Sequence, residues 1–199
     1  MSDSRDALDD FLAAFHSRDH EKRWVSADQG SRFAKAIAGD YNPLHDPDAP
    51  RFCVPGDLLF GLVIGQYGLY RQLELTFKGM LRADSVLLYP ENPPASFSIA
   101  GETGREYVSV NRQNPLNAAP SVQLGLIKAY VACSGQTFPD LLQPLLAKEG
   151  VMFNPERPFV VYDRMFMTLE RAPHQSPSLH LASSGLETDG KRGDAYFEF

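Results

Sequence analysis

The chain has 199 residues, of which 43% are hydrophobic and 22% are charged, and its formal net charge is −6. This composition excludes a disordered chain and suffices for a good-sized domain with a substantial core. The negative charge disfavours nucleic acid and anionic membranes as partners, because both bind to basic surfaces.

The first residues, MSDSRDALDDFLAAFHSRDH, carry acids where a secretory signal would be basic. The longest apolar run, Leu58 to Ile64, is far shorter than the roughly 20 residues of a membrane helix. Cys53 and Cys133 lack the CxxC spacing of a metal or redox site, which predicts reduced, partly buried thiols. The sequence therefore predicts a cytoplasmic protein without a membrane-spanning segment.

Two helices are predicted before residue 40. Residues 1–24 form an arm whose short amphipathic helix carries apolar side chains at helical spacing, and a charged link from Arg18 to Arg23 follows it. Ser26 is a candidate N-cap for the second helix, and Gly39 is the residue that can end it. The apolar face of this second helix consists of Phe33, Ala34, Ile37 and Ala38.

A stiff loop and a buried helix come next. Prolines at positions 43, 47, 50 and 55 deny the loop regular structure. The segment GDLLFGLVIGQYGLYRQL, Gly56 to Leu73, is apolar nearly all round and predicts a long buried helix. Its glycines at 61, 65 and 68 would allow a wrapping sheet to approach closely.

The remaining segments predict mostly antiparallel strands. The first group consists of LELTFKGM, SVLLYP, SFSIAGE, REYVSVNRQ and VQLGLIKAYVA. A helix, FPDLLQPLLAKEG, precedes a second group formed by FVVYDRMFMTLERA, PSLHLASSGLET and GDAYFEF. Because the order of helix and strands partly repeats, we predict an α+β fold with one unit at 25–134 and a shorter unit at 135–199 packed on it.

The loop AGDYNPLHD, Ala38 to Asp46, carries the strongest functional signal. Asp40 and His45 lie five positions apart across a segment that Pro43 stiffens. They are predicted to face the same point, at the rim of a mostly apolar cleft beside the start of the following helix. An acid and a base that converge on one small volume are what general acid–base catalysis requires. The alternative interpretation is a helix C-cap followed by a turn, in which Gly, Asp and Asn serve the backbone alone.

This loop, with Gly39, Asp40, Asn42, Pro43 and His45 as GDxNPxH before a buried helix, resembles the MaoC-like dehydratase family, which includes the R-specific enoyl-CoA hydratases. The run DxNPLHD…RFCVPGDLLF is similar to a proteobacterial branch of that family. The resemblance implies a hotdog fold, in which an antiparallel sheet wraps the long helix, here with a partial second hotdog-like repeat. It also implies that the acyl tunnel forms where two such units meet, either in a homodimer or in an internal pseudo-dimer that the second half of the chain completes.

The activity implied by the resemblance is hydration or dehydration of an enoyl thioester, carried by coenzyme A or by an acyl-carrier protein. His45 would be the base, Asp40 the acid, and the amide of Asn42 would orient either the water or the carboxyl group. No cofactor and no metal are implied.

Substrate-binding positions would be Tyr41, Pro55, Gly56 and Asp57, with the Gly56 N–H directed at the thioester oxygen. This chain departs from the family pattern at two of these positions, since the family has histidine at Pro55 and an apolar residue at Asp57.

Two other functions stay open from the sequence. Asp57 could serve a hotdog thioesterase as its single carboxylate, or the protein could be a non-catalytic scaffold that binds acyl thioesters. A nucleophilic Cys53 is disfavoured, because no base is placed for it. The remaining histidines show no metal-binding pattern and are expected at the surface; they are His16, His20, His174 and His180.

Overall fold

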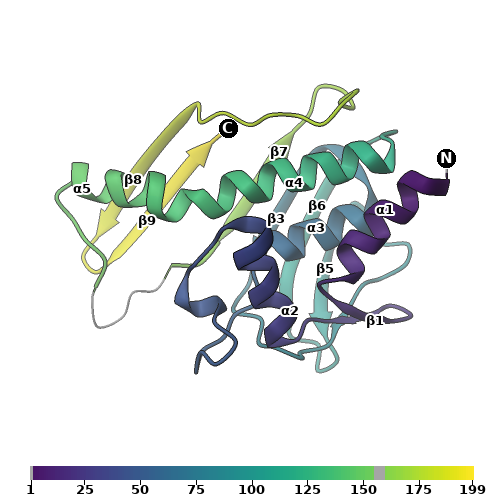
Figure 1. Cartoon of the computed structure of the whole chain (residues 1–199), viewed down its shortest axis with the longest axis horizontal. Helices are drawn as coiled ribbons and strands as arrows, with labels where there is room; N and C mark the ends of the chain where they lie inside the picture. Colours follow the sequence, from purple (N-terminus) through teal and green to yellow (C-terminus); the bar gives the residue numbers. More distant parts are fainter. Residues whose placement is uncertain (1, 155–159) are drawn as a thin grey trace.

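The computed structural model describes residues 2–154 and 160–199, and for residues 2–4 and 136–139 the description covers the backbone alone. Helices lie against a large, curved antiparallel sheet, which makes this an α+β protein (Figure 1). The helices are α1 (Ser2–Ala13), α2 (Ala27–Arg32), η1 (Phe33–Ala38), η2 (Pro43–His45), α3 (Gly56–Tyr67), α4 (Pro120–Gln136), η3 (Thr137–Leu142) and α5 (Gln143–Lys148).

The described residues form a seven-stranded sheet in the order β1-β2-β4-β5-β6-β3-β7, and a separate two-stranded sheet, β8-β9. All pairings are antiparallel, and Leu75 of β3 lies between Val110 of β6 and Met165 of β7. The strands are β1 (Ser17–Asp19), β2 (Lys22–Trp24), β3 (Leu69–Phe77), β4 (Leu87–Leu88), β5 (Ser96–Gly101), β6 (Glu106–Leu116), β7 (Arg164–Thr168), β8 (Ser183–Asp189) and β9 (Arg192–Glu198).

The N-terminal arm is held to the body by aromatic packing. The predicted amphipathic helix is present as α1, which packs on α3 and α4. The ring of Phe15 meets that of Phe33 edge-on, with centroids 5.2 Å apart. The charged link that follows is not a loop, because β1 and β2 form a hairpin at one edge of the large sheet.

The second predicted helix begins and ends as expected. Ser26 Oγ accepts a hydrogen bond from the Gln29 N–H at 3.1 Å, and Gln29 Oε1 accepts one from the Ser26 N–H at 3.0 Å, which is a capping box. Gly39 ends the helix with φ 69°, a conformation that glycine adopts without strain. The last turns, η1, are π-helical, so the backbone is locally wider just before the GDYNPLH loop.

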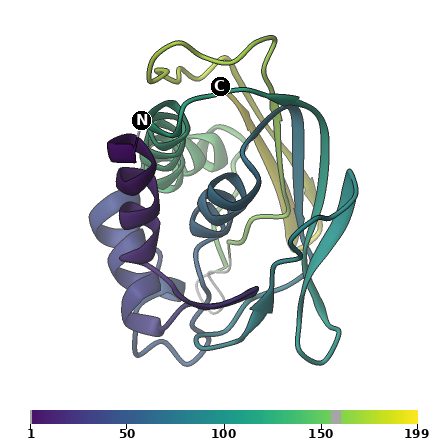
Figure 2. The same ribbon diagram turned by 90° about the vertical axis from the view of Figure 1, so that its right-hand side faces the viewer.

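Helix α3 is buried along most of its length but ends six residues earlier than predicted. Gly68 has φ 79° and ψ −167°, which breaks the helix, and Leu69 begins β3. The prediction of a helix as far as Leu73 was therefore wrong. Figure 2 shows α3 between the curved sheet on one side and helices α1, α2 and α4 on the other, so that it forms the centre of the core.

A second correction concerns the segment VQLGLIKAYVA, which was predicted as a strand and is helix α4. Its buried side chains lie three or four positions apart, as on one side of a helix, and they are Val122, Gln123, Leu126, Ile127, Val131 and Ser134. A continuous apolar run of this length does not distinguish a buried helix from a buried strand by periodicity.

The C-terminal part contributes to both sheets. The predicted helix at 138–150 is present as η3 and α5, which continue from α4. Strand β7 joins the large sheet beside β3, whereas β8 and β9 form their own hairpin. The first residue of the predicted strand, Phe159, lies outside the described residues. In the part of the chain that the structure describes, no helix is long and apolar enough to cross a membrane.

Candidate functional site

The GDYNPLH loop is fixed by its own backbone and side-chain bonds. Asp40 Oδ1 accepts a hydrogen bond from the Asn42 N–H at 2.8 Å, and Asn42 Oδ1 accepts one from the Leu44 N–H at 3.1 Å. The Cys53 N–H donates to the Leu44 carbonyl at 2.9 Å, which ties the far end of the loop to its middle. These bonds hold the loop beside the first turn of α3.

Asp40 and His45 meet, as their spacing predicts. His45 Nε2 lies 3.3 Å from Asp40 Oδ2, and His45 Nδ1 lies 2.7 Å from the Cys53 carbonyl oxygen. A carbonyl oxygen can only accept, so Nδ1 carries the hydrogen. The favourable contact between Nε2 and a carboxylate oxygen then requires one further proton, on either the imidazole or the carboxyl group. The pair therefore holds one transferable proton.

The surroundings of His45 favour the protonated form of its imidazole. Burial by itself lowers the pKa of His45, but the hydrogen bonds to Asp40 and to the Cys53 carbonyl, together with the charges of Asp40 and Asp57, raise it above its ordinary value. Both members of the pair are largely shielded from water. Such a pair can give a proton at one atom and take one at the other, which is the basis of acid–base chemistry on a single molecule.

The other loop residues divide into two groups. Asn42 is buried, and its Nδ2 donates to the Val160 carbonyl at 3.5 Å, so it links the loop to the segment before β7. Tyr41, predicted to bind substrate, is 74% exposed and does not join Asp40 and His45. The Asn42 amide thus bonds to the backbone of Leu44 and Val160, it is the Asn42 backbone N–H that reaches Asp40, and Tyr41 lies in solvent.

The first turn of α3 adds a second carboxyl group. Pro55 is the N-cap and is buried, and Gly56 and Asp57 provide backbone N–H groups that a helix leaves without intrahelical partners. Asp57 itself is only 3% exposed, and its Oδ1 has no hydrogen-bond partner among the described residues.

The charge state of Asp57 follows from this burial. Burial and the charge of Asp40 raise the pKa of Asp57, the neighbouring Ser134, His45 and Tyr162 offset part of the effect, and the result is a pKa of about 7. Near neutral pH the carboxyl group is therefore protonated in much of the population, and a protonated carboxyl can donate a hydrogen bond.

Three residues near Asp57 were missed from the sequence, namely Tyr130, Ser134 and Tyr162. The pKa of Tyr130 and that of Tyr162 are raised by burial and by the charge of Asp57, although Tyr162 as a whole is 38% exposed. No spacing signal links them to the loop, because they come from α4 and from the segment before β7. Only the tertiary fold could reveal them.

Tyr162 also covers the start of α3. A Cβ atom at Gly56 would lie 3.0 Å from Tyr162 Cδ2 and 3.3 Å from Phe77 Cζ, so the glycine permits a close approach. The Phe77 N–H donates to the Asp163 carbonyl at 2.9 Å, which fixes this covering segment to the end of β3. The segment around Tyr162 therefore covers the start of α3, and the side chains of Asp40 and His45 beside it are largely shielded from solvent.

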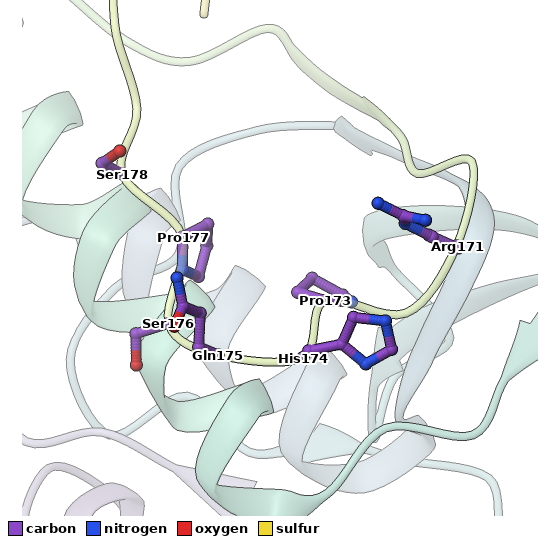
Figure 3. Close-up of a pocket in the computed structure, with 7 residues that line it drawn as sticks. All are labelled: Arg171, Pro173, His174, Gln175, Ser176, Pro177 and Ser178. Carbon is purple, nitrogen blue, oxygen red and sulfur yellow. The ribbon is translucent and has the colours of Figure 1, made fainter.

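The apolar cleft expected beside this pair does not coincide with either cavity described for the structure. One, of about 440 Å³, is lined by seven residues of the loop between β7 and β8, including Arg171 and His174 (Figure 3). The other, of about 200 Å³, lies between α1, α3 and the β1-β2 hairpin. Asp40 and His45 line neither of them.

The remaining sequence candidates are placed as follows. Cys53 and Cys133 are free and partly buried, and burial raises the pKa of the Cys53 thiol, which disfavours a thiolate nucleophile. The expectation of surface histidines is wrong for His16, which is buried, whereas the other three are exposed. Among the described residues, no group of three or more His, Cys, Asp or Glu side chains is positioned to hold a metal ion.

The fold and the site define an α+β protein with a buried acid–base pair at the start of its central helix. The chain belongs to the family described as "Protein of unknown function (DUF3581)", whose model matches residues 10–199. No curated protein and no solved structure matches the chain. The family description names no reaction, so the chemistry of the site is the basis for a functional proposal.

Proposed function

We propose that this protein is a hotdog-type enzyme that adds water to, or removes it from, an enoyl thioester carried by coenzyme A or an acyl-carrier protein. The observation that carries the proposal is the contact of His45 Nε2 with Asp40 Oδ2 at 3.3 Å, beside the N-terminus of a buried helix. The strand order β2-β4-β5-β6-β3 around α3 supports the hotdog assignment, because in that fold the strand before the helix and the strand after it lie at opposite edges of the wrapping sheet.

The pair has the groups that hydration needs. The proton of the pair first passes from His45 to Asp40 across their contact. Imidazole Nε2 of His45 then takes a proton from water as the water oxygen attacks the β-carbon, and the Asp40 carboxyl delivers its proton to the α-carbon. Asn42 fixes the loop and directs its amide toward the segment that covers the site. After the addition the pair again holds one proton, so no further acid or base is required.

Negative charge that develops on the thioester oxygen requires donors nearby. The free backbone N–H groups of the first turn of α3 and the positive end of its dipole act there. An ionised Asp57 would oppose this charge, whereas its protonated form adds a donor. Because its pKa is raised, Asp57 can be uncharged near neutral pH and then does not repel the charge that develops on the thioester oxygen.

The test is hydration of crotonyl-CoA and longer enoyl-CoAs by the purified chain, followed by loss of the conjugated enoyl absorbance. We expect Asp40→Asn and His45→Gln each to lower kcat about 100-fold or more, with thermal unfolding little changed. Asp48→Asn in the same loop and His174→Gln, both exposed, are matched controls and should keep full activity. Turnover that survives in both Asp40→Asn and His45→Gln would refute the proposed role of the pair.

A second function, thioester hydrolysis by Asp57, is favoured by one observation, the unpartnered Oδ1 in a buried carboxyl group. This reaction would need the ionised form, so its rate should rise with pH through about 7. Release of free thiol that is lost in Asp57→Asn and retained in Asp40→Asn would favour hydrolysis over hydration. Thioester binding with neither reaction would favour the scaffold.

A further inference from the structure

The cavity of about 200 Å³ beside the N-terminal arm is lined by several basic side chains. It lies where the end of α1 and the β1-β2 hairpin meet the last turn of α3. Gln66 in this wall follows Asp57 by nine residues, or about 13 Å along the helix. The cavity is therefore separate from the pair of Asp40 and His45, and nothing inferred about it depends on the proposed function.

Arg23 is the central residue of this cavity. It is only 7% exposed, its guanidinium lies 4.5 Å from the centre of the Tyr89 ring, and its Nη2 donates to Gln66 Oε1. Its Nη1 is buried without a hydrogen-bond partner, and among the described residues no carboxylate lies within 4.0 Å of it. A buried cation without a counter-charge is costly, so this environment is incomplete as it stands.

Arg18 increases the imbalance. It lies directly opposite Arg23 across the β1-β2 pair, and both residues line the cavity. Like charges at directly opposite positions of two strands repel each other and destabilise the pairing. An anion between the two guanidinium groups would convert this repulsion into two attractive contacts.

A third polar group in this cavity comes from the end of the arm. His16 Nδ1 lies 2.7 Å from the Leu12 carbonyl, which can only accept, so Nδ1 carries a hydrogen and Nε2 is left for another partner. Burial, together with the charges of Arg23 and Arg18, lowers the pKa of His16. The acids in the wall do not balance these groups, because Asp9 pairs with Arg5 at 3.4 Å and only Asp10 remains.

We propose that this cavity binds a small phosphate-type oxyanion between Arg18, Arg23 and His16, and that the bound anion joins the N-terminal arm to the body of the protein. The two guanidinium groups approach from the two strands of the hairpin and offer more N–H donors than the two oxygens of a carboxylate can use, which suits the three or four oxygens of a phosphate. The free Nε2 of His16 can accept a hydrogen bond from a phosphate hydroxyl. The anion is either inorganic phosphate or the phosphoryl end of a small organic molecule.

The experiment is calorimetric titration of the full chain with inorganic phosphate at constant ionic strength, with methyl phosphate and acetate as parallel ligands. We expect saturable binding of phosphate, and about tenfold or greater weakening in Arg18→Gln, which removes one charged donor. Arg18 lies on a short edge strand, so its replacement leaves the core intact. Arg23→Lys, which keeps the charge and loses the fork, should weaken binding similarly.

Lys22→Gln is the matched control, since it removes the same charge from the neighbouring position of the hairpin but pairs with Glu102 instead of lining the cavity. It should bind phosphate as the wild type does. Tighter binding of methyl phosphate would identify an organic phosphomonoester as the source of the anion, and tighter binding of phosphate the free ion. The proposal is overturned if the wild type shows no saturable binding, if acetate binds equally well, or if Arg18→Gln and Lys22→Gln bind alike.

Discussion

The fold changes the ionisation of Asp57 from what its position in the sequence suggests. A carboxylate at the start of a helix is ordinarily favoured by the helix dipole. Here burial outweighs that effect and raises the pKa of Asp57 to about 7. The unfolded chain would ionise this group near pH 4, so the folded state binds a proton that the unfolded state has lost between those two values.

This difference predicts the pH dependence of stability. Because the folded state holds the extra proton, the free energy of unfolding falls as pH rises from about 4 to about 7, by on the order of 4 kcal/mol in total. Asp57→Asn removes the titration, so the variant should be more stable than the wild type at pH 9 and close to it at pH 4. Urea unfolding across this range measures the difference.

Asp48→Asn serves as the control for that comparison, because Asp48 is exposed. It should leave the pH dependence of unfolding unchanged. A wild type that is as stable as Asp57→Asn at pH 9 would show that the Asp57 carboxyl is not held protonated by its surroundings.

At the same scale, the sequence could predict a contact only where it is local. Asp40 and His45 are joined by a short loop whose geometry Gly39 and Pro43 restrict, so their meeting follows from nearby residues. Ser134 and Tyr162 reach Asp57 from positions far along the chain, and no spacing in the sequence links them to it. The contact of Asp40 with His45 was therefore predictable and its surroundings were not.

Among the elements, the contact between α4 and η1 positions the loop. A Cβ atom at Gly135 would collide with the carbonyl oxygen of Ala38, so α4 approaches this backbone more closely than any side chain allows. Ala38 directly precedes Gly39 and Asp40. The glycine therefore determines how near α4, with Ser134, comes to the acid–base pair.

Gly135→Ala should consequently disturb both stability and activity. The clash is with backbone, which cannot rotate away, and we expect a loss of about 2 kcal/mol or more in the free energy of unfolding. Thermal unfolding measures that loss. The rate of hydration should also fall, because a shift of Ala38 would displace Asp40 from His45. Ala132→Ser, at an exposed position of the same helix, should change neither quantity appreciably. An unaltered melting temperature in Gly135→Ala would contradict the close approach.

Sequence patterns predicted some helix ends correctly but did not predict the end of α3 or the identity of α4. The N-cap at Ser26 and the helix end at Gly39 are local signals, and both were predicted correctly. The end of α3 was missed because Gly68 could equally be a helical glycine that admits close packing. The identity of α4 was missed because its apolar run fits a buried helix and a buried strand equally well.

For the whole molecule, exposed apolar side chains gather in the C-terminal third. Phe166 on β7 is 65% exposed, and Tyr196 on β9 is 57% exposed. Others in this region are Met152, Val161, Leu181 and Phe199. A hairpin of only two strands such as β8-β9 is marginally stable by itself, although α5 packs against β8. Exposed apolar side chains in this number favour an interface with a partner in the C-terminal region.

Strand β7 makes a second copy of the chain the best candidate for the partner. It is the last strand of the large sheet, so its outer backbone groups are open to pairing. A two-fold axis beside β7 would pair it antiparallel with its own copy and extend the sheet across both subunits, and two-fold dimers are the commonest oligomers.

We therefore expect a homodimer, measured by light scattering at micromolar concentration. Phe166→Glu and Tyr196→Glu should each shift it toward monomer, because each buries a charge in the interface. Tyr41→Glu, an exposed aromatic residue outside this region, should leave the dimer intact. A wild type that scatters as a monomer would rule out this arrangement and leave the exposed face of β7 for a different protein.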